Sequence, residues 1–413
     1  MASGGRESLG QKPVRRASPV ARVMVLVDTL AAGGAERVAV DLACGVDRRA
    51  FDPHVVVTKR GGPLEESLIA AGVRYTVLAR RRKTAVRPAL RVLQLARDSD
   101  LIHSHLFGNN VWGALLARAA GTPLLAHEHN RVNRTRFEPI FDRRLIGPTA
   151  HRILCVSEQV ARPLAAVGVD PRAIEILPNG VHLDRALGRR DARSELGLAD
   201  DDVVVGTVAS LRPEKAHDVL LEAFAAVVRG RWPTVRLCLV GDGSERTTLQ
   251  AHAVRLGIEN RVIWAGERRE AARLPSAFDV AVLCSRNEGL PLAALEAMAA
   301  GTPLICSRAG SMPALLRGGA GLLVEPGDAA GLAAAIAGLL ADRERARELA
   351  RRGRELVATK FDVAAAVRHL EGIYEAVLEE ARAAERPRSL TNALAAVTLS
   401  VGSRKRPDRE HAG

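Results

Sequence analysis

Short apolar runs that alternate with helical stretches restrict the fold of this chain more than any other sequence feature. Runs of this length and apolarity are typical of strands buried on both faces of a parallel sheet, between two layers of helices. Such strands are joined by right-handed crossovers, and ligands bind at their carboxyl ends. In the first half of the chain the runs are residues 23–27, 54–58, 74–78, 100–104, 123–126 and 151–157.

The series stops in a polar stretch, residues 187–202, and then begins again. With 413 residues the chain is too long for a single core. The sequence therefore predicts two doubly wound, Rossmann-like α/β domains, residues 21–186 and 203–360, which face each other across a cleft, with 187–202 as the linker. A helix over 361–384 is expected to close the second domain and to cross back to the first. The runs of the second half are residues 203–208, 235–241, 261–266, 279–285, 303–307 and 321–325.

Charge and composition narrow the class of partner. The formal net charge is +13, which favours an acidic partner such as nucleotide phosphates or an anionic membrane. Aromatic residues make up 3% of the chain and no aromatic RNA-binding motif occurs, so nucleic acid is not expected. Residues 1–20 read as a disordered basic tail without an apolar signal region, and 385–413 as a second basic tail. We expect a cytoplasmic protein, peripheral at most to the inner face of the plasma membrane.

Metal binding has little support in the pattern of ligand-type residues. Five cysteines are scattered, without a C-x-x-C or H-E-x-x-H motif. Two histidine pairs, His103 with His105 and His127 with His129, stand at strand ends, where they could bind a metal. We prefer one histidine in contact with substrate and the others satisfied structurally. The D-x-D segments at 98–100 and 200–202 precede strands and read as solvated turns. Neither a metal nor a cofactor is expected.

A glycine loop follows the first strand in "LAAGGAERV". Gly33 and Gly34 would let the backbone approach a ligand, and the start of the next helix favours an anion. A tight strand–helix turn explains the same residues equally well. The segment "GDGSER" in the second half opens a similar loop, but it lacks the G-K-[ST] ending of an ATP-binding loop.

Two glutamates eight positions apart mark the segment "SRNEGLPLAALEAMAAGTPLICS", residues 285–307. Glu288 lies on the loop after a predicted strand, Pro291 suits the first turn of a helix, and Glu296 lies further along that helix. The start of the helix would favour a diphosphate, and carboxylates accept charge-assisted hydrogen bonds from hydroxyl groups. A ribose on one side and a hexose on the other would fit.

This E-x7-E spacing, followed by "EAMAAGTPLI", resembles the retaining glycosyltransferases of family 4, which have the GT-B fold. The similarity covers about residues 23–378. It includes "GGAERV", "HSHLFGNN", "PLLAHEHN", "ILPNGVHLDR", "LRPEKAHDVLLEAF", "LVGDGSE" and "GLLVEPGD" in the order of the family. A set of motifs in this order is far more specific than any one of them.

The resemblance implies a nucleotide-sugar donor on the C-terminal domain, an acceptor on the N-terminal domain and no required metal. Two positions depart from the family: Ser210 replaces a common arginine, which Arg212 could compensate, and Ala314 replaces a common glutamate. The implied catalytic residues are Glu288, at the sugar hydroxyls, His129, near the reacting centre, and Lys215, at the diphosphate. The implied donor-binding residues are Gly33, Gly34, Arg212, Lys215, Gly289, Leu290 and Glu296, the last at the ribose.

The function expected from this resemblance is retaining transfer of a hexose to a glycan or lipid-linked acceptor in cell-envelope or exopolysaccharide synthesis. The leaving phosphate would assist the acceptor on the same face of the sugar. A nucleotide-sugar epimerase of the same fold and a weakly active binding protein are the alternatives. Two basic clusters, residues 80–87 and 130–144, predict docking of the N-terminal domain on an anionic membrane. Phe137, Ile140 and Phe141 add apolar side chains to the second cluster.

Overall fold

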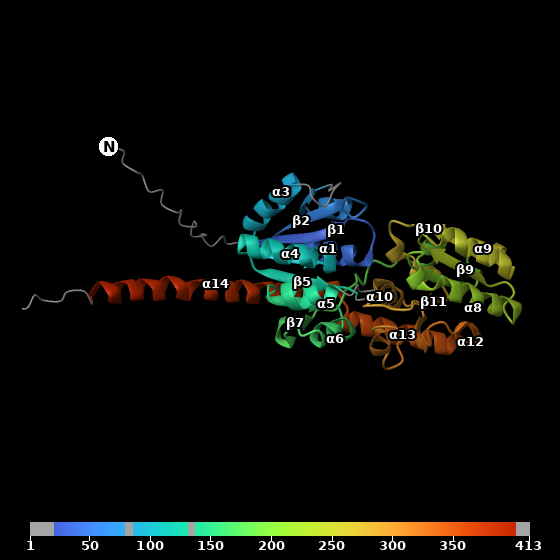
Figure 1. The fold of residues 1–413 in the computed structure, drawn as a ribbon. Coiled ribbons are helices and arrows are strands. Elements are labelled where there is room, and N and C mark those ends of the chain that lie inside the picture. Colours follow the sequence, from blue (N-terminus) through green and yellow to red (C-terminus); the bar gives the residue numbers. More distant parts are fainter. Residues whose placement is uncertain (1–19, 79–85, 131–136, 402–413) are drawn as a thin grey trace, which may run out of the picture.

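Two parallel sheets form the framework of the molecule (Figure 1). The computed structural model describes residues 20–78, 86–130 and 137–401. The first sheet has the strand order β3-β2-β1-β4-β5-β6-β7. Its strands are β1 (Ala21–Thr29), β2 (Phe51–Arg60), β3 (Arg74–Val77), β4 (Leu101–His105), β5 (Leu124–Glu128), β6 (Arg152–Cys155) and β7 (Ile174–Ile176).

The second sheet has the order β10-β9-β8-β11-β12-β13. The strands of both sheets pair in parallel, with one isolated antiparallel bridge between Gly241 and Gly266, and the strand order reverses beside β1 and beside β8. The prediction of two doubly wound domains is therefore confirmed, and each apolar run lies on a strand. The short strand β7 was not predicted from the sequence. The strands of the second sheet are β8 (Val204–Val208), β9 (Arg236–Val240), β10 (Val262–Gly266), β11 (Val280–Leu283), β12 (Leu304–Ser307) and β13 (Leu322–Val324).

Helices connect the strands and cover the two sheets. The last of them extends past residue 384, where the sequence led us to expect its end. Among the described residues, no helix is long and apolar enough to cross a membrane. The α-helices are α1 (Gly34–Gly45), α2 (Glu65–Ala70), α3 (Val86–Arg97), α4 (Phe107–Ala120), α5 (Glu138–Phe141), α6 (Glu158–Ala166), α7 (Arg189–Glu195), α8 (His217–Arg229), α9 (Arg246–Leu256), α10 (Leu292–Ala299), α11 (Met312–Leu315), α12 (Ala329–Ala341), α13 (Arg343–Lys360) and α14 (Val363–Val401).

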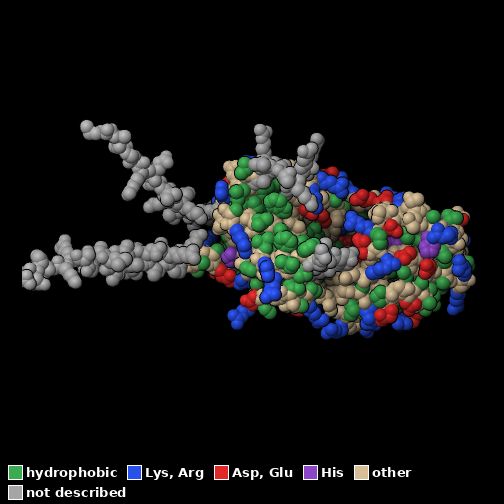
Figure 2. Space-filling view, in the orientation of Figure 1, with side chains coloured by type: hydrophobic (Ala, Val, Ile, Leu, Met, Phe, Trp, Pro, Cys, Tyr) green, Lys and Arg blue, Asp and Glu red, His purple; other side chains and the backbone are tan. Residues whose placement is uncertain are grey.

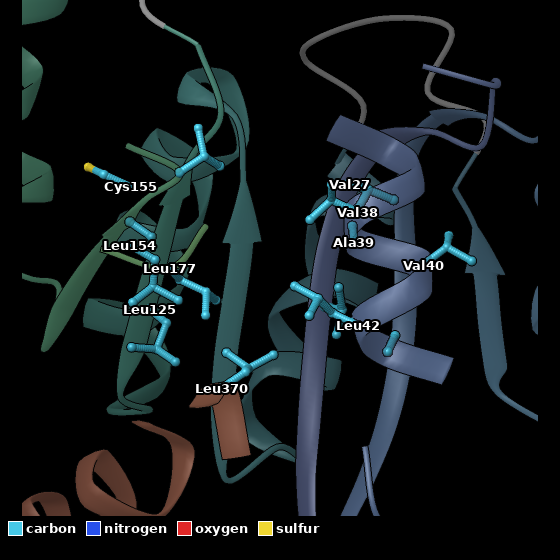
Figure 3. Close-up of a cluster of buried hydrophobic side chains, with 14 of the residues drawn as sticks. Val27, Val38, Ala39, Val40, Leu42, Leu125, Leu154, Cys155, Leu177 and Leu370 are labelled. Atoms are coloured by element: carbon cyan, nitrogen blue, oxygen red, sulfur yellow. The ribbon is translucent and has the colours of Figure 1, made fainter. Parts of the chain in front are cut away.

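One hydrophobic core runs from the first sheet into the second domain, because Leu292 and Leu295 of α10 belong to the same cluster as the residues of β1 and β4. Figure 3 shows part of this cluster, with side chains of α1, β5 and β6 and with Leu370 of α14. The hydroxyl of Tyr374 on α14 lies 2.7 Å from Nδ1 of His103. The final helix thus packs on the N-terminal domain, although it follows the second domain in sequence.

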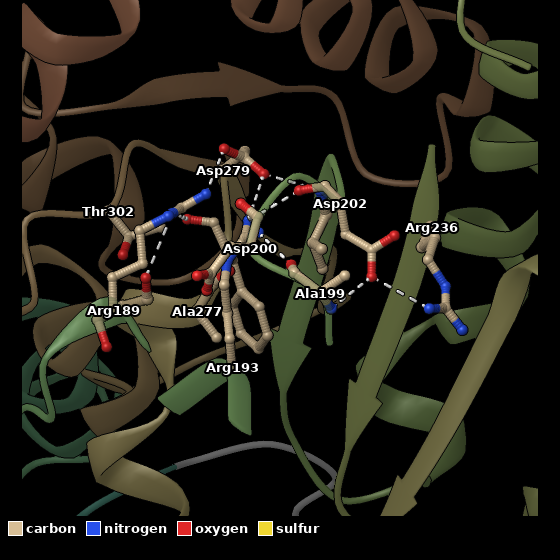
Figure 4. Close-up of polar contacts among 12 residues, drawn as sticks. Arg189, Arg193, Ala199, Asp200, Asp202, Arg236, Ala277, Asp279 and Thr302 are labelled. Atoms are coloured by element: carbon tan, nitrogen blue, oxygen red, sulfur yellow. Dashed lines mark hydrogen bonds and ion pairs between the residues drawn. The ribbon is translucent and has the colours of Figure 1, made fainter. Parts of the chain in front are cut away.

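The polar segment 187–202 contains helix α7 and a buried arginine (Figure 4). The side chain of Arg193 is 1% exposed and donates to the carbonyl oxygens of Ala199, Asp200, Asp202 and Ala277. It also pairs with the Asp279 carboxylate at 3.1 Å. A buried guanidinium needs several hydrogen-bond acceptors. Two of them, the Ala277 carbonyl and the Asp279 carboxylate, belong to the second domain, so Arg193 holds the segment against that domain.

Candidate functional site

The order of strands in the second sheet brings two loops together at its carboxyl edge. β8 pairs with β11, so the turn after β8 lies beside the loop after β11. Lys215 ends the first of these turns, Pro213–Lys215, and its Nζ lies 2.5 Å from Oε1 of Glu288 on the second loop. The Lys215 side chain is 23% exposed and that of Glu288 8%, so the pair is only partly open to solvent.

Arg286 holds the turn that carries Lys215. Its backbone N–H donates to the carbonyl of Glu214 at 2.9 Å, and its guanidinium contacts the Pro213 carbonyl and the carboxylate of Asp218. The Arg212 side chain, by contrast, is exposed and makes no hydrogen bond or ion pair with another described residue. Of these three cations, Lys215 is therefore the one that the fold directs at Glu288.

The loop of Glu288 is pressed against the N-terminal domain at a glycine. A β-carbon at Gly289 would overlap the carbonyl oxygen of His129, so a larger residue could not allow this approach. Asn179 donates to the Leu290 carbonyl at 2.7 Å, also across the domain boundary. The Leu290 side chain is buried in the core, so only the backbone of this residue is available to a ligand.

Glu296 lies on α10 and faces the other domain. Its carboxylate is 6% exposed, and Nη2 of Arg37 on α1 lies 2.7 Å from its Oε1. The contact is a close ion pair without the alignment of a hydrogen bond, so Arg37 neutralises Oε1 without donating a well-aligned N–H to it. A buried carboxylate oxygen in this state can accept a hydrogen bond from a ligand hydroxyl.

The glycine loop before α1 leaves open space at Gly34, whereas a β-carbon at Gly33 would overlap the Glu36 carboxylate. Gly33 is the N-cap of α1 with φ −73°, and a β-carbon at Gly34 would meet nothing within 4 Å. Neither glycine is therefore required by a left-handed backbone or by close packing against protein backbone. The start of α1 is accessible, and its unpaired N–H groups can bind an anion.

Four buried histidines form a cluster on β4 and at the end of β5. Nδ1 of His105 lies 2.9 Å from Nε2 of His129, and Nε2 of His103 lies 3.3 Å from Nδ1 of His127. Burial lowers the pKa of His129 to about 3, and burial followed by the charge of His129 lowers the pKa of His103 to about 3. His129 is thus neutral at physiological pH, and its imidazole can exchange hydrogen bonds but cannot supply a positive charge.

Ring nitrogens of His103, His105 and His127 lie within 4.8 Å of one another, close enough for a metal ion to be considered. However, both ring nitrogens of His103 already have partners, Tyr374 and His127. A metal bound there would have to replace one of these hydrogen bonds. The hydrogen bonds to Tyr374 and His127 already satisfy both ring nitrogens of His103. We therefore still expect this site to bind no metal.

The structure brings together the expected residues Glu288, Lys215, Gly289 and His129, whereas Arg212 lies apart. Sequence reasoning did not single out Arg37, Asn179 or Arg286. Arg37 is four positions after Gly33, about one helical turn further on. This spacing was the one sequence signal that could have placed Arg37 near the glycine loop. Asn179 and Arg286 hold other loops by hydrogen bonds to backbone carbonyl groups. No local sequence pattern predicts such contacts.

Two facing Rossmann-like domains, whose loops meet at the domain boundary, define the GT-B class of glycosyltransferases. Family models match both halves: "Glycosyltransferase Family 4" over residues 32–185 and "Glycosyl transferases group 1" over 188–356. The D-inositol 3-phosphate glycosyltransferase 2 of Catenulispora acidiphila is 32% identical over 87% of each chain. The chain belongs to the family 4 glycosyltransferases.

Two further comparisons concern a curated relative and a solved structure. The lipopolysaccharide core biosynthesis glycosyltransferase LpsE of Rhizobium meliloti is 33% identical over 51% of this chain and 59% of its own. The Anabaena protein HepE, solved in complex with UDP-glucose, has a TM-score of 0.78 and 24% identity, and the match covers 86% of this chain and 100% of that one. The last similarity is evidence for the fold.

Proposed function

We propose that this glycosyltransferase transfers a hexose-type sugar from a nucleotide-sugar to a glycan or lipid-linked acceptor with retention of the anomeric configuration. The observation that carries this proposal is the ion pair of Lys215 with Glu288, which lies just before the start of α10. Helix α10 itself carries Glu296, which pairs with Arg37. The lysine and the helix start suit a diphosphate, and the two carboxylates suit a polyhydroxylated group on either side of it. The UDP-glucose bound to HepE supports a donor of this chemical class.

The proposed roles follow from where charge develops. As the bond between the anomeric carbon and the diphosphate oxygen breaks, negative charge grows on the diphosphate, and Lys215 stabilises it together with loop N–H groups at Gly289 and Leu290. Glu288 accepts hydrogen bonds from the sugar and Glu296 from the ribose. Neutral His129 contacts the sugar side of the cleft. The leaving phosphate then takes the proton of the attacking acceptor hydroxyl on the same face.

A screen of UDP-, GDP- and ADP-sugars by thermal shift tests the donor class. We expect one base to raise the unfolding temperature and the others to leave it nearly unchanged, because a ligand that binds only the folded state stabilises it. Nucleotide release with the selected donor then tests transfer. If no nucleotide-sugar raised the unfolding temperature, the proposed donor class would be wrong.

Metal independence is a separate prediction. Turnover in excess EDTA should stay within about twofold of the untreated enzyme, because the charges proposed for the leaving group come from Lys215 and backbone N–H groups. The assay is nucleotide release before and after incubation with the chelator. Loss of turnover that magnesium or manganese restores would contradict the prediction.

The acceptor proposal rests on an apolar surface of the N-terminal domain. Figure 2 shows hydrophobic side chains gathered over α4 and α5, with Lys and Arg among them. Phe137 is 53%, Ile140 51% and Phe141 42% exposed, and Arg143 and Arg144 follow them. Of the basic clusters predicted to dock, residues 80–85 and 131–136 lie outside the described residues. We propose that this surface rests on an anionic membrane that holds the acceptor, in polysaccharide or cell-envelope synthesis.

Membrane docking should appear in liposome flotation as recovery on vesicles with phosphatidylglycerol but not on neutral ones, and it should weaken as salt rises. Each basic residue at an anionic surface contributes about 1 kcal/mol, and salt screens it over about 8–10 Å. Replacing Phe137, Ile140 and Phe141 with serine should lower recovery several-fold. Val254→Ser, at an exposed apolar position of α9, is the matched control. Equal recovery on both vesicle types would favour a soluble acceptor.

A further inference from the structure

Arg37 is a cation for which the proposed mechanism has no role, yet it lies inside the site. It stands in the first turn of α1, next to the open glycine loop, and its guanidinium crosses the domain boundary to Glu296. The Arg37 side chain is 18% exposed and the Glu296 side chain 6%, so the pair is largely shielded from water. The partner of Arg37 is thus the same carboxylate that we assign to the ribose.

The cavity beside this pair is narrow. A cavity lined by Arg37, Asp41, Gly180, His182, Arg185 and Glu296 has a volume of about 10 Å³. That is roughly the space needed by one water molecule. A pentose is many times larger, so this cavity offers no room for a ribose beside the Arg37–Glu296 pair. A ribose hydroxyl that binds Oε1 of Glu296 therefore competes with Arg37, whose Nη2 lies 2.7 Å from the same oxygen.

We propose that Arg37 binds the diphosphate of the donor, and that Glu296 holds it only while the site is empty. The proposal rests on the proposed function. When ribose hydroxyls replace Arg37 on Glu296, the guanidinium is released beside the start of α1, where N–H groups already favour an anion. A guanidinium is well suited to a diphosphate, because it donates two parallel hydrogen bonds to phosphate oxygens. Arg37 would then supply, from the facing domain, the second cation beside Lys215.

Other cations near the site fit this role less well. Arg286 is engaged by the Pro213 carbonyl and by Asp218, neither of which the donor would displace. Arg212 is exposed and has no contact with another described residue that would direct it inward. Arg37 alone among these three arginines has a partner that the donor itself would take.

The test compares two ligands that differ only in phosphate, the nucleoside and the nucleoside diphosphate of the base selected in the donor screen. Affinities are measured by ligand-observed NMR titration for wild type, Arg37→Gln and Arg37→Lys. Arg37→Gln should bind the diphosphate roughly ten- to a hundredfold more weakly, the usual loss of a charge-assisted contact. It should bind the nucleoside at least as tightly as wild type, because the competitor for Glu296 is gone. Arg37→Lys should recover most of the diphosphate affinity.

Arg48→Gln, at a half-exposed surface arginine paired with Asp52, is the matched control. If Arg37→Gln weakened both ligands equally, Arg37 would be a clamp between the domains and the proposal would be wrong. Unchanged affinity for both ligands would also overturn it. If wild-type protein bound neither ligand, the proposed function would be wrong, and this inference would be wrong with it.

Discussion

Lys215→Ala should lower nucleotide release roughly 10²–10³-fold, the usual effect of removing one group that stabilises a developing anion. Nζ of Lys215 lies 2.5 Å from Glu288 and is the cation that the turn after β8 directs into the site. Donor affinity should fall as well, because the diphosphate carries negative charge before the bond breaks. Turnover with the selected donor and calorimetric titration measure the two effects. Lys360→Ala, in the last turn of α13, is the matched control.

Loss of Lys215 also leaves the buried Glu288 carboxylate without its cation, which is itself costly. Thermal unfolding is therefore measured in parallel. In the double variant Lys215→Ala/Glu288→Gln the uncompensated charge is removed, so stability should return while turnover stays low. Wild-type turnover and donor affinity in Lys215→Ala would contradict the assignment of this lysine to the diphosphate.

Mild acid should unfold the N-terminal domain. Burial is the main cause that lowers the pKa of all four clustered histidines, to about 3 for His103 and His129 and well below the ordinary value for His105 and His127. Below the ordinary pKa of 6.5 the unfolded chain binds these protons and the folded chain does not. Stability is thus complete above this pH and falls as the pH drops from it toward the folded values.

The size of this effect follows from linkage. Each histidine should cost about 1.4 kcal/mol per pH unit in that window, so four together approach the whole stability of a domain within one or two units. Urea unfolding between pH 7.5 and 5 measures the slope. Replacing His105 with Asn and His127 with Gln should reduce the slope by about two protons, with His369→Gln on the exposed side of α14 as the control. A stability that did not change over this range would contradict the burial of neutral histidines.

The framework could be predicted because it depends on local patterns. Apolar runs bounded by helical stretches define strands whatever the partner strand is, so the runs at 203–208 and 279–285 were located before any pairing was known. The strand β7 escaped because Glu175 interrupts its short apolar run, whereas β13, which is equally short, is apolar throughout. The packing of segment 187–202 could not be predicted either, since it depends on Arg193 reaching the Ala277 carbonyl and the Asp279 carboxylate, 84 and 86 positions away.

The site was predictable to the same extent. Glu288 and Lys215 each follow a strand, and the doubly wound order places those two strands side by side, so their meeting needs only topology. The pairing of Arg37 with Glu296 has no such basis, because it depends on how one domain sits against the other. For the same reason the sequence could not show that Gly289 lies against the backbone of His129.

Titration of the selected nucleotide-sugar into wild-type protein and Glu296→Ala, by calorimetry, tests the central claim most directly. That claim places the ribose of a nucleotide-sugar donor at Glu296, whose Oε1 is paired with Arg37 at 2.7 Å in the empty site. We expect a measurable wild-type affinity and a loss of about 1.5–3 kcal/mol in the variant, the value of hydrogen bonds to a charged group. Equal affinities of the two proteins, or a wild-type protein that binds no nucleotide-sugar, would contradict the account.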